Sequence, residues 1–382
     1  MLIPRHISDI SVNDIMKAAI SLCSVNNTDI LLRELFGEKE FVYLENARAG
    51  IYLTLAHLPP GEVILPAFIC QFVPHMVISA GHRPIFIDIG KDQLTFMIDQ
   101  VKEAISTKTR AIIAAHLFGI PWDLRELVAL TRSKGIILIE DAAAAFGSKY
   151  AGQFVGTMGD VAVFSFGKGK ALPIGRGGLL VINNSMMKDN IFSSIKSMGK
   201  GNCFYAAIFL LANNIIYKPM VYSLAYSVQQ RIKGGDFWEK GEIGESDKCA
   251  FKLMDALIKK VLERQLSDWR KQFLRRQEIA FKYKNNISNP LLHHFTINED
   301  MEPSWPCYPL RVENREKLFK YMHDNKIDLS WSWSYNIAAV YGQKGCQNAT
   351  YLSESILSLP LYPSLPDEIV DQIISLANQY AA

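Results

Sequence analysis

Cysteine and net charge are both scarce in this sequence. The 382 residues include six cysteines, and no two of them form a C-x-x-C pair. This scatter offers neither a zinc-binding spacing nor a disulfide framework, so we expect a reducing, cytoplasmic location and no metal site. Lysine and arginine number 41 against 38 acidic residues, which gives a formal net charge of +3. Such a small excess does not indicate a nucleic-acid partner.

The sequence also lacks an apolar run long enough to cross a membrane. The longest run, 203–212, has ten residues, and polar residues and Pro219 interrupt the segment that continues to 230. A spanning helix needs about 20 apolar residues. We therefore expect 203–230 to be an apolar helical insert, either a buried hairpin or a dimer contact, with contact to a membrane surface as the less favoured alternative. The amino terminus lacks the apolar segment of a signal peptide.

Apolar residues make up 49% of the chain, enough to fill the core of one large domain and a smaller one. Predicted strands in the first half mostly alternate with helices of about ten to fifteen residues, which is typical of βαβ units in a mainly parallel sheet. These strands are 41–45, 63–70, 83–88, 110–119, 135–140, 160–166 and 179–183.

A glycine-rich, charged connector at 233–246 is the expected domain boundary. It divides the chain into a large domain, 1–235, and a small domain, 236–382. From Leu253 to Phe273 apolar residues recur at spacings of three and four, which predicts a long amphipathic helix. Strand and helix patterns then alternate to the carboxyl terminus.

The most informative stretch is 140–178, which holds an acid and a lysine at strand ends. The strand 135–140 is followed by Asp141, and the strand 160–166 runs into a glycine-rich loop that contains Lys170. Ligands of open α/β sheets bind at the carboxyl ends of the strands. Pyridoxal phosphate needs a lysine for its Schiff base and an acid that keeps its ring nitrogen protonated. An ordinary α/β turn is the alternative interpretation.

The same stretch resembles the signature of the DegT/DnrJ/StrS sugar aminotransferases, a branch of the fold-type I pyridoxal phosphate enzymes in the aspartate aminotransferase superfamily. The resemblance implies an α/β fold with a mostly parallel seven-stranded sheet between helices, and a smaller α+β carboxyl-terminal domain. The matching residues are Glu140, Asp141, Ala142, Ala143, Gly147, Tyr150, Gly152, Gly156, Gly159, Asp160, Phe164, Ser165, Phe166, Lys170, Gly175, Gly177 and Gly178.

The resemblance also implies roles for individual residues. Lys170 is expected to be the catalytic lysine that binds the cofactor covalently, and Asp141 the catalytic partner of its ring nitrogen. Ser165 is expected to bind the cofactor phosphate. Ala47 and Arg48 match the family's phosphate cup, where a turn opens a helix and presents backbone N–H groups.

Two further residues match family positions near the cofactor. Cys70 occupies the place of the residue that packs over the cofactor ring, although a buried structural cysteine is an equal alternative. His116 matches the family's HLFG motif, although a lone histidine at a strand end is more often structural.

Some positions depart from the family pattern. Ala144 stands where most members have Gln or His, and Arg176 replaces the Glu of the GEGG motif. Phe251 and Leu253 fall where an Asn and an Arg are usual. Each change removes a polar contact and retains the lysine, so we expect altered cofactor binding or substrate choice.

The resemblance implies an aminotransferase that uses pyridoxal phosphate. It would move an amino group from an amino acid, with glutamate expected, to a nucleotide-linked 3- or 4-keto sugar for surface polysaccharide or a glycosylated metabolite. A homodimer with a shared active site is expected. The alternatives are a non-catalytic regulatory or scaffold protein and another pyridoxal phosphate reaction, such as a lyase or desulfurase. A nicotinamide enzyme is disfavoured because the loop lacks the third glycine of G-x-G-x-x-G.

Overall fold

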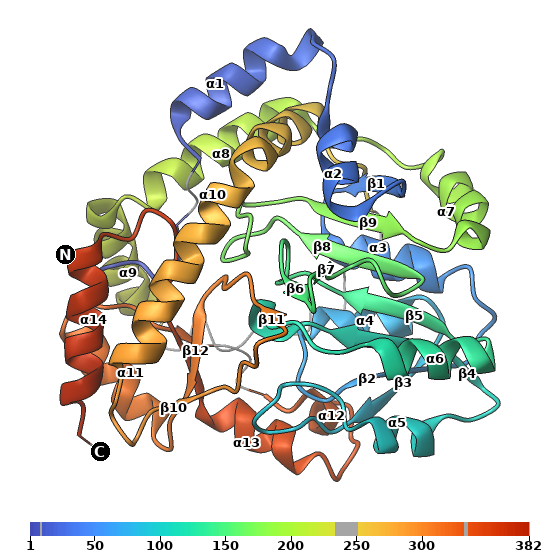
Figure 1. Ribbon diagram of the computed structural model, residues 1–382. Helices are drawn as coiled ribbons and strands as arrows, with labels where there is room; N and C mark the ends of the chain where they lie inside the picture. Colours follow the sequence, from blue (N-terminus) through green and yellow to red (C-terminus); the bar gives the residue numbers. More distant parts are fainter. Residues whose placement is uncertain (8–9, 234–250, 332–334, 382) are drawn as a thin grey trace.

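A seven-stranded sheet forms the centre of the computed structural model, which describes residues 1–7, 10–233, 251–331 and 335–381 (Figure 1). Four of the six pairs of neighbouring strands are parallel, and the other two, β8 with β9 and β9 with β1, are antiparallel. This confirms the predicted mostly parallel sheet. Its strands, in spatial order, are β1 (Glu40–Leu44), β9 (Gly178–Ile182), β8 (Val161–Ser165), β5 (Ile137–Asp141), β4 (Thr109–Ala115), β2 (Glu62–Pro66) and β3 (Arg83–Ile87).

Helices cover both faces of this sheet, because successive strand residues point to opposite sides. Val63, Ile113 and Val163 pack in one core cluster with α3 (Ala47–Leu55), α4 (Phe72–Ser79) and α7 (Lys188–Ile195). Ile64 and Leu138 face the other side, where α5 (Ile98–Ala104) and α6 (Arg125–Lys134) pack. Burial on both faces explains why these strands read as continuous apolar runs.

The carboxyl-terminal part is built on an antiparallel sheet. Its order is β10 (His293–His294), β12 (Tyr308–Arg311), β14 (Ile356–Leu359) and β13 (Ser330–Trp331). A third small sheet joins β11 (Met301–Glu302) to β6 (Lys149–Tyr150) and β7 (Gln153–Phe154). The helices of this part are α11 (Arg315–Asp324), α12 (Ile337–Val340), α13 (Gln347–Ser355) and α14 (Asp367–Gln379).

The predicted long amphipathic helix is confirmed as α10, Ala256–Asn286. Its first part shares a core cluster with α1 (Val12–Ile20) and α2 (Thr28–Phe36), and it contacts α14 of the carboxyl-terminal part. The expected domain boundary at 235/236 lies outside the described residues and stays a prediction.

The strand predicted at 110–119 was too long. Strand β4 ends at Ala115, and Leu117–Gly119 form a short 3-10 turn. Phe118 and Gly119 have positive φ angles of 55° and 76°, and a Cβ on Gly119 would lie 2.6 Å from Oγ of Ser304. The apolar sequence therefore concealed a turn that packs against a distant segment.

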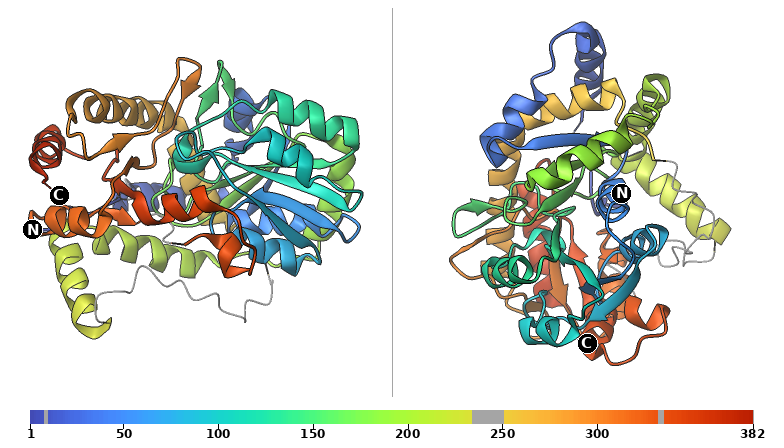
Figure 2. Two further views of the ribbon diagram at one scale, coloured as in Figure 1. Left: turned by 90° about the horizontal axis from the view of Figure 1, so that it is seen from below. Right: turned by 90° about the vertical axis from the view of Figure 1, so that its right-hand side faces the viewer.

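The apolar insert forms two helices, α8 (Cys203–Ile216) and α9 (Pro219–Lys233), and α9 projects from the side of the molecule (Figure 2). Within the described residues, no single helix is long and apolar enough to cross a membrane, and the two helices satisfy that criterion only as a pair bent by 95°. Phe204 and Tyr205 are 69% and 67% exposed. Of the two expected alternatives, the buried hairpin is therefore wrong for these residues, and the dimer contact stays a prediction.

Candidate active site

Three predicted site residues follow neighbouring parallel strands at the same edge of the sheet. His116 follows β4, Asp141 ends β5 and Ser165 ends β8. The backbone N–H of His116 donates to the carbonyl of Asp141 at 3.0 Å, and Asp141 pairs with Val163 of β8. The parallel order therefore brings the three residues to the edge where α/β sheets bind ligands.

The predicted phosphate cup lies beside them at the start of α3. Ser165 pairs with Gly178 of β9, and Gly178 pairs with Leu44 at the end of β1, three residues before Ala47. The side chain of Asn46 caps α3 by accepting the N–H of Ala49 at 3.1 Å. The N–H groups of Ala47 and Arg48 belong to the first turn and have no acceptor within the helix.

Gly178 permits this close approach. A Cβ placed on it would lie 2.3 Å from the carbonyl carbon of Asn46 and 2.4 Å from the nitrogen of Ala47. Only a glycine therefore allows the strand to run directly beneath the start of α3. A helix N-terminus beside a serine hydroxyl fits a phosphate, because its first-turn N–H groups and its dipole favour an anion.

Lys170 lies in the loop between β8 and β9, and this loop is closed at its base. The N–H groups of Ile174 and Gly175 both donate to the carbonyl of Phe166 at 2.9 Å, and Gly167 bridges Gly175. Lys170 interacts electrostatically with Asp141, and this interaction acts to lower the pKa of the Asp141 carboxyl. The structure thus brings the two predicted catalytic residues to one place.

The environment of Asp141 fits a cationic ring nitrogen. Burial raises the pKa of its carboxyl above the usual value, and the N–H of Ala143, Lys170 and His116 only partly offset that effect. One carboxylate oxygen accepts the N–H of Ala143 at 3.1 Å, and Asp141 makes no ion pair with any residue that the structure describes. A protonated pyridine nitrogen would supply the missing opposite charge.

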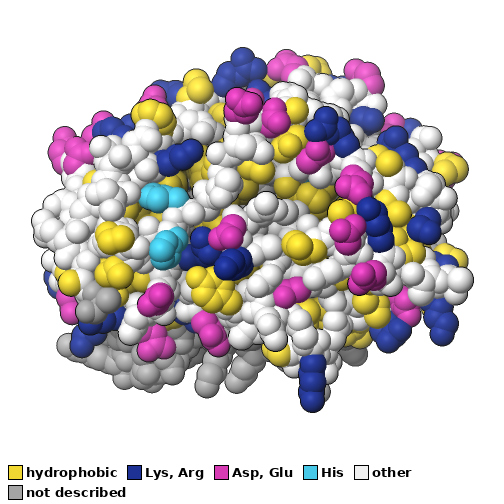
Figure 3. Space-filling model, turned by 60° about the horizontal axis from the view of Figure 1, so that its bottom comes forward, with side chains coloured by type: hydrophobic (Ala, Val, Ile, Leu, Met, Phe, Trp, Pro, Cys, Tyr) yellow, Lys and Arg dark blue, Asp and Glu magenta, His cyan; other side chains and the backbone are white. Residues whose placement is uncertain are grey.

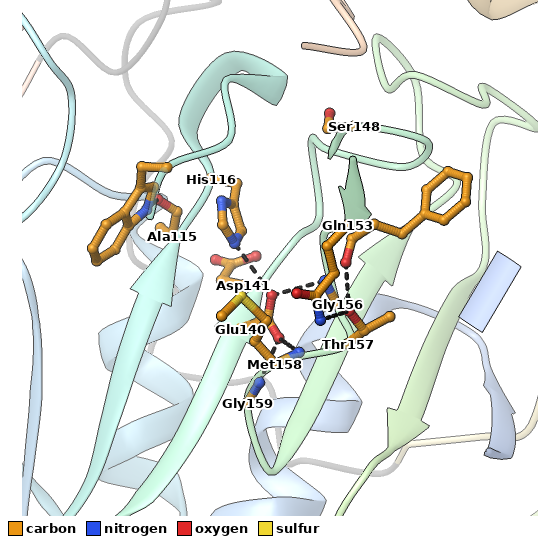
Figure 4. Close-up of polar contacts among 12 residues, drawn as sticks. Ala115, His116, Glu140, Asp141, Ser148, Gln153, Gly156, Thr157, Met158 and Gly159 are labelled. Atoms are coloured by element: carbon orange, nitrogen blue, oxygen red, sulfur yellow. Dashed lines mark hydrogen bonds and ion pairs between the residues drawn. The ribbon is translucent and has the colours of Figure 1, made fainter. Parts of the chain in front are cut away.

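Glu140 has a role that the sequence did not reveal. Its buried carboxylate accepts three backbone N–H groups, from Gly156 and Met158 at 2.7 Å and from Gly159 at 2.6 Å (Figure 4). Nε2 of His116 lies 3.4 Å from the same carboxylate. Although burial acts to raise it, the pKa of Glu140 is lowered by His116 and these N–H groups. The acid next to Asp141 in the sequence could have indicated this position.

Glu140 therefore joins His116 to the loop before β8. His116 is buried, and its second ring nitrogen has no hydrogen-bond partner among the described residues. This arrangement assigns His116 a fixed orientation next to the Asp141 backbone. A role for its ring toward the cofactor remains a prediction.

Cys70 follows β2 in the segment that meets the carboxyl-terminal part. The N–H of Gln71 donates to the hydroxyl of Tyr335 at 3.0 Å, and Ile337 donates to Ala67. Burial raises the pKa of the Cys70 thiol. Nearby Lys170 and Arg48 act to lower this pKa, but their effects are smaller. Cys307 also interacts electrostatically with Lys170, and burial raises its pKa as well. Raised pKa values disfavour the thiolate form at these two positions.

The residues that depart from the family pattern have partners of their own. Arg176 forms an ion pair with Glu45, and the ring of Phe251 lies 5.2 Å from that of Tyr52. The carbonyl of Ala144 accepts the Ser304 hydroxyl at 3.2 Å. These positions are therefore integrated in the fold.

Known proteins resemble this chain over most of its length. GDP-perosamine synthase of Escherichia coli O157:H7 is 26% identical over 345 residues, covering 88% of this chain and 84% of its own. The spore coat polysaccharide biosynthesis protein SpsC of Bacillus subtilis is 28% identical over 359 residues, with coverage of 88% and 84%. Among solved structures, the Spr1654 protein of Streptococcus pneumoniae in its PMP form has a TM-score of 0.77 at 23% identity, covering 98% of each chain.

The fold and the strand-end site define a fold-type I pyridoxal phosphate enzyme. The family model of the DegT/DnrJ/EryC1/StrS aminotransferases matches residues 25–377, so the chain belongs to that family. It is a pyridoxal phosphate-dependent aminotransferase of the sugar aminotransferase class.

Proposed function

We propose that this enzyme transfers the amino group of glutamate to a nucleotide-linked 3- or 4-keto sugar, for surface polysaccharide or a glycosylated metabolite. The observation that carries this proposal is that Asp141 ends β5 and that Lys170, in the loop after β8, acts electrostatically on its carboxyl. The names of two relatives, a GDP-perosamine synthase and a spore coat polysaccharide biosynthesis protein, support a sugar acceptor of this kind.

Each site residue has a defined task in this proposal. Bound pyridoxal phosphate supplies the electron sink for the electron pair left at the substrate Cα. Asp141 holds a proton at the pyridine nitrogen, while Ser165 and the N–H groups of Ala47 and Arg48 bind the phosphate. The amine of Lys170 takes the Cα proton of the amino donor as a general base. Cys70 covers one side of the ring.

The assembly is a second part of the proposal. Enzymes of this family are typically dimeric, and we propose a cytoplasmic homodimer with a shared active site. The exposed apolar side chains of Phe204, Tyr205 and Ile208 on α8 support a surface that another copy covers. The face shown in Figure 3 mixes acidic, basic and apolar side chains. Light scattering after size exclusion would measure the mass in solution, and contact of α8 and α9 with a membrane is the competing outcome.

Absorption spectra of the protein with pyridoxal phosphate test the role of Lys170. The wild type should show a band near about 410–430 nm that Lys170→Ala abolishes and Lys168→Ala retains. Glutamate should shift the band of the wild type to shorter wavelength. Turnover by Lys170→Ala would refute the assignment, and a spectrum without any Lys170-dependent band would favour the regulatory or scaffold alternative.

A further inference from the structure

The loop that carries Lys170 is anchored unevenly: Leu172 and Ile174 after the lysine are buried in the core, whereas a glycine directly precedes the lysine. Between its closed base residues Gly167 and Gly175 it contains Gly169, and the φ angles of Gly169 and Gly175 are +65° and +96°. Glycine loses more conformational freedom on folding than any other residue. A loop of this composition needs contacts from outside if it is to hold a lysine in one orientation.

Helix α8 supplies one such contact. A Cβ on Gly175 would lie 3.2 Å from Cε1 of Phe209 and 3.5 Å from Nδ2 of Asn213. The ammonium of Lys168 and the guanidinium of Arg176 each lie 5.7 Å from the centroid of the Phe209 ring. Cations at this distance are attracted to an aromatic face. Phe209 therefore touches the loop on both sides of Lys170.

The amino-terminal segment supplies a second contact. A Cβ on Gly169, the residue directly before Lys170, would lie 3.6 Å from the His6 ring. His6 Nε2 and the hydroxyl of Tyr217 share a hydrogen bond of 3.2 Å, and Tyr217 lies at the end of α8, 5.4 Å from the Lys168 ammonium. Burial, with Arg5 and Lys168 nearby, lowers the pKa of His6 to about 3, so its ring is neutral beside these cations.

Both contacts are anchored to the rest of the fold. Ala206 and Leu210 of α8 are buried in the core cluster that includes α10. On the amino-terminal side, Arg5 pairs with buried Asp328 at 2.7 Å, and Ile3 bridges Ile327. The His6–Tyr217 hydrogen bond joins these two anchored segments next to the Lys170 loop.

We propose that His6, Phe209 and Tyr217 are positioning residues, which hold the loop 167–175 in the conformation that presents Lys170 to Asp141. The inference rests on the proposed role of Lys170 and adds a task for the apolar insert. The insert then serves the active site through half-buried Phe209 of α8, whereas Phe204 and Tyr205 at the start of the same helix are exposed.

The test compares Phe209→Ala with Phe204→Ala, the same change at an exposed position about 140° away around the same helix. Hydrogen exchange of the cofactor-free proteins should be about tenfold faster in the loop 167–175 for Phe209→Ala only. The Lys170-dependent absorption band should form about tenfold more slowly and titrate at a shifted pH in the same variant, with kcat reduced more than the KM for glutamate. Phe209→Tyr, which keeps the ring, should restore these properties.

Tyr217→Phe is the second variant, because it removes only the hydroxyl that meets His6 and leaves the ring in place. It should accelerate exchange in the loop without changing the urea midpoint of unfolding. Equal exchange rates and equal band formation in Phe209→Ala and Phe204→Ala would overturn the inference. Faster loop exchange with unaltered band formation would overturn it as well. The hydrogen-exchange measurement needs no cofactor and therefore tests the loop contacts independently. If the wild type showed no Lys170-dependent absorption band, this would count against the proposed function, but not against the proposal that His6, Phe209 and Tyr217 hold the loop.

Discussion

Glu140 gives the sharpest prediction, because a single buried carboxylate organises the loop before β8. Its Oε1 accepts the N–H groups of Met158 and Gly159, and its Oε2 accepts that of Gly156. In Glu140→Gln one oxygen becomes an NH₂ group. If the remaining oxygen keeps Met158 and Gly159, the N–H of Gly156 faces a donor and loses its acceptor.

The magnitude follows from these contacts. A buried N–H without an acceptor costs roughly 1–3 kcal/mol, and hydrogen bonds to a charged group exceed neutral ones by about 1 kcal/mol each. Relief of the desolvation of the carboxylate offsets part of this loss. We expect Glu140→Gln to lower the free energy of unfolding by about 2–4 kcal/mol at pH 7.

Urea unfolding of the cofactor-free proteins measures this difference. Glu302→Gln is the matched control, since Glu302 has a 45% exposed side chain and a single 3.4 Å ion pair with Lys149. It should change the stability by less than about 0.5 kcal/mol. Equal stability of Glu140→Gln and the wild type at pH 7 would refute the reasoning.

The pH dependence adds a second check. In the folded state the pKa of Glu140 is below its usual value of 4.5. As the pH falls, Glu140 is therefore protonated in the unfolded chain at a higher pH than in the folded protein. The stabilisation is therefore complete above about pH 4.5 and is lost as the pH falls through the lower folded pKa. The difference in the free energy of unfolding between the wild type and Glu140→Gln should therefore become smaller as the pH falls below about 4.5. A difference that stays constant over this range would show that the charge of Glu140 is not its source.

Two further substitutions test the cofactor site. Asp141→Asn should raise the stability of the cofactor-free protein at pH 7 by up to about 2 kcal/mol, because burial raises the pKa of this carboxyl and its charge therefore costs stability above the usual pKa. The same variant should bind pyridoxal phosphate more weakly. In thermal melts, its melting temperature relative to the wild type should therefore be higher without cofactor and lower with it. A lower melting temperature of the cofactor-free variant would contradict the argument. Gly178→Ala should cost about 1–3 kcal/mol and weaken phosphate binding, because its Cβ meets the backbone of Asn46 and Ala47. Gly199→Ala, with nothing within 4 Å of its Cβ, is the control in urea unfolding and cofactor titration, and equal losses in both variants would argue against the close approach at Gly178.

The sequence alone determined the local elements and the strand-end residues. Short apolar runs placed most strands of the large sheet. The resemblance to a known family singled out Lys170, Asp141 and Ser165, because the motif residues are close together in the chain. Parallel strands align their carboxyl ends, so residues at those ends meet without further information. The sequence also predicted α10, because its apolar spacing persists over many turns.

Only the tertiary structure decided which distant segments support these residues. Glu140 binds N–H groups 16 to 19 positions away, and Gln71 meets Tyr335 across 264 positions. The placement of α8 over the Lys170 loop depends on contacts with α1 and α10, which no periodicity of the insert encodes. Local patterns report which side of an element is apolar, whereas its partner is fixed by the packing of the whole chain.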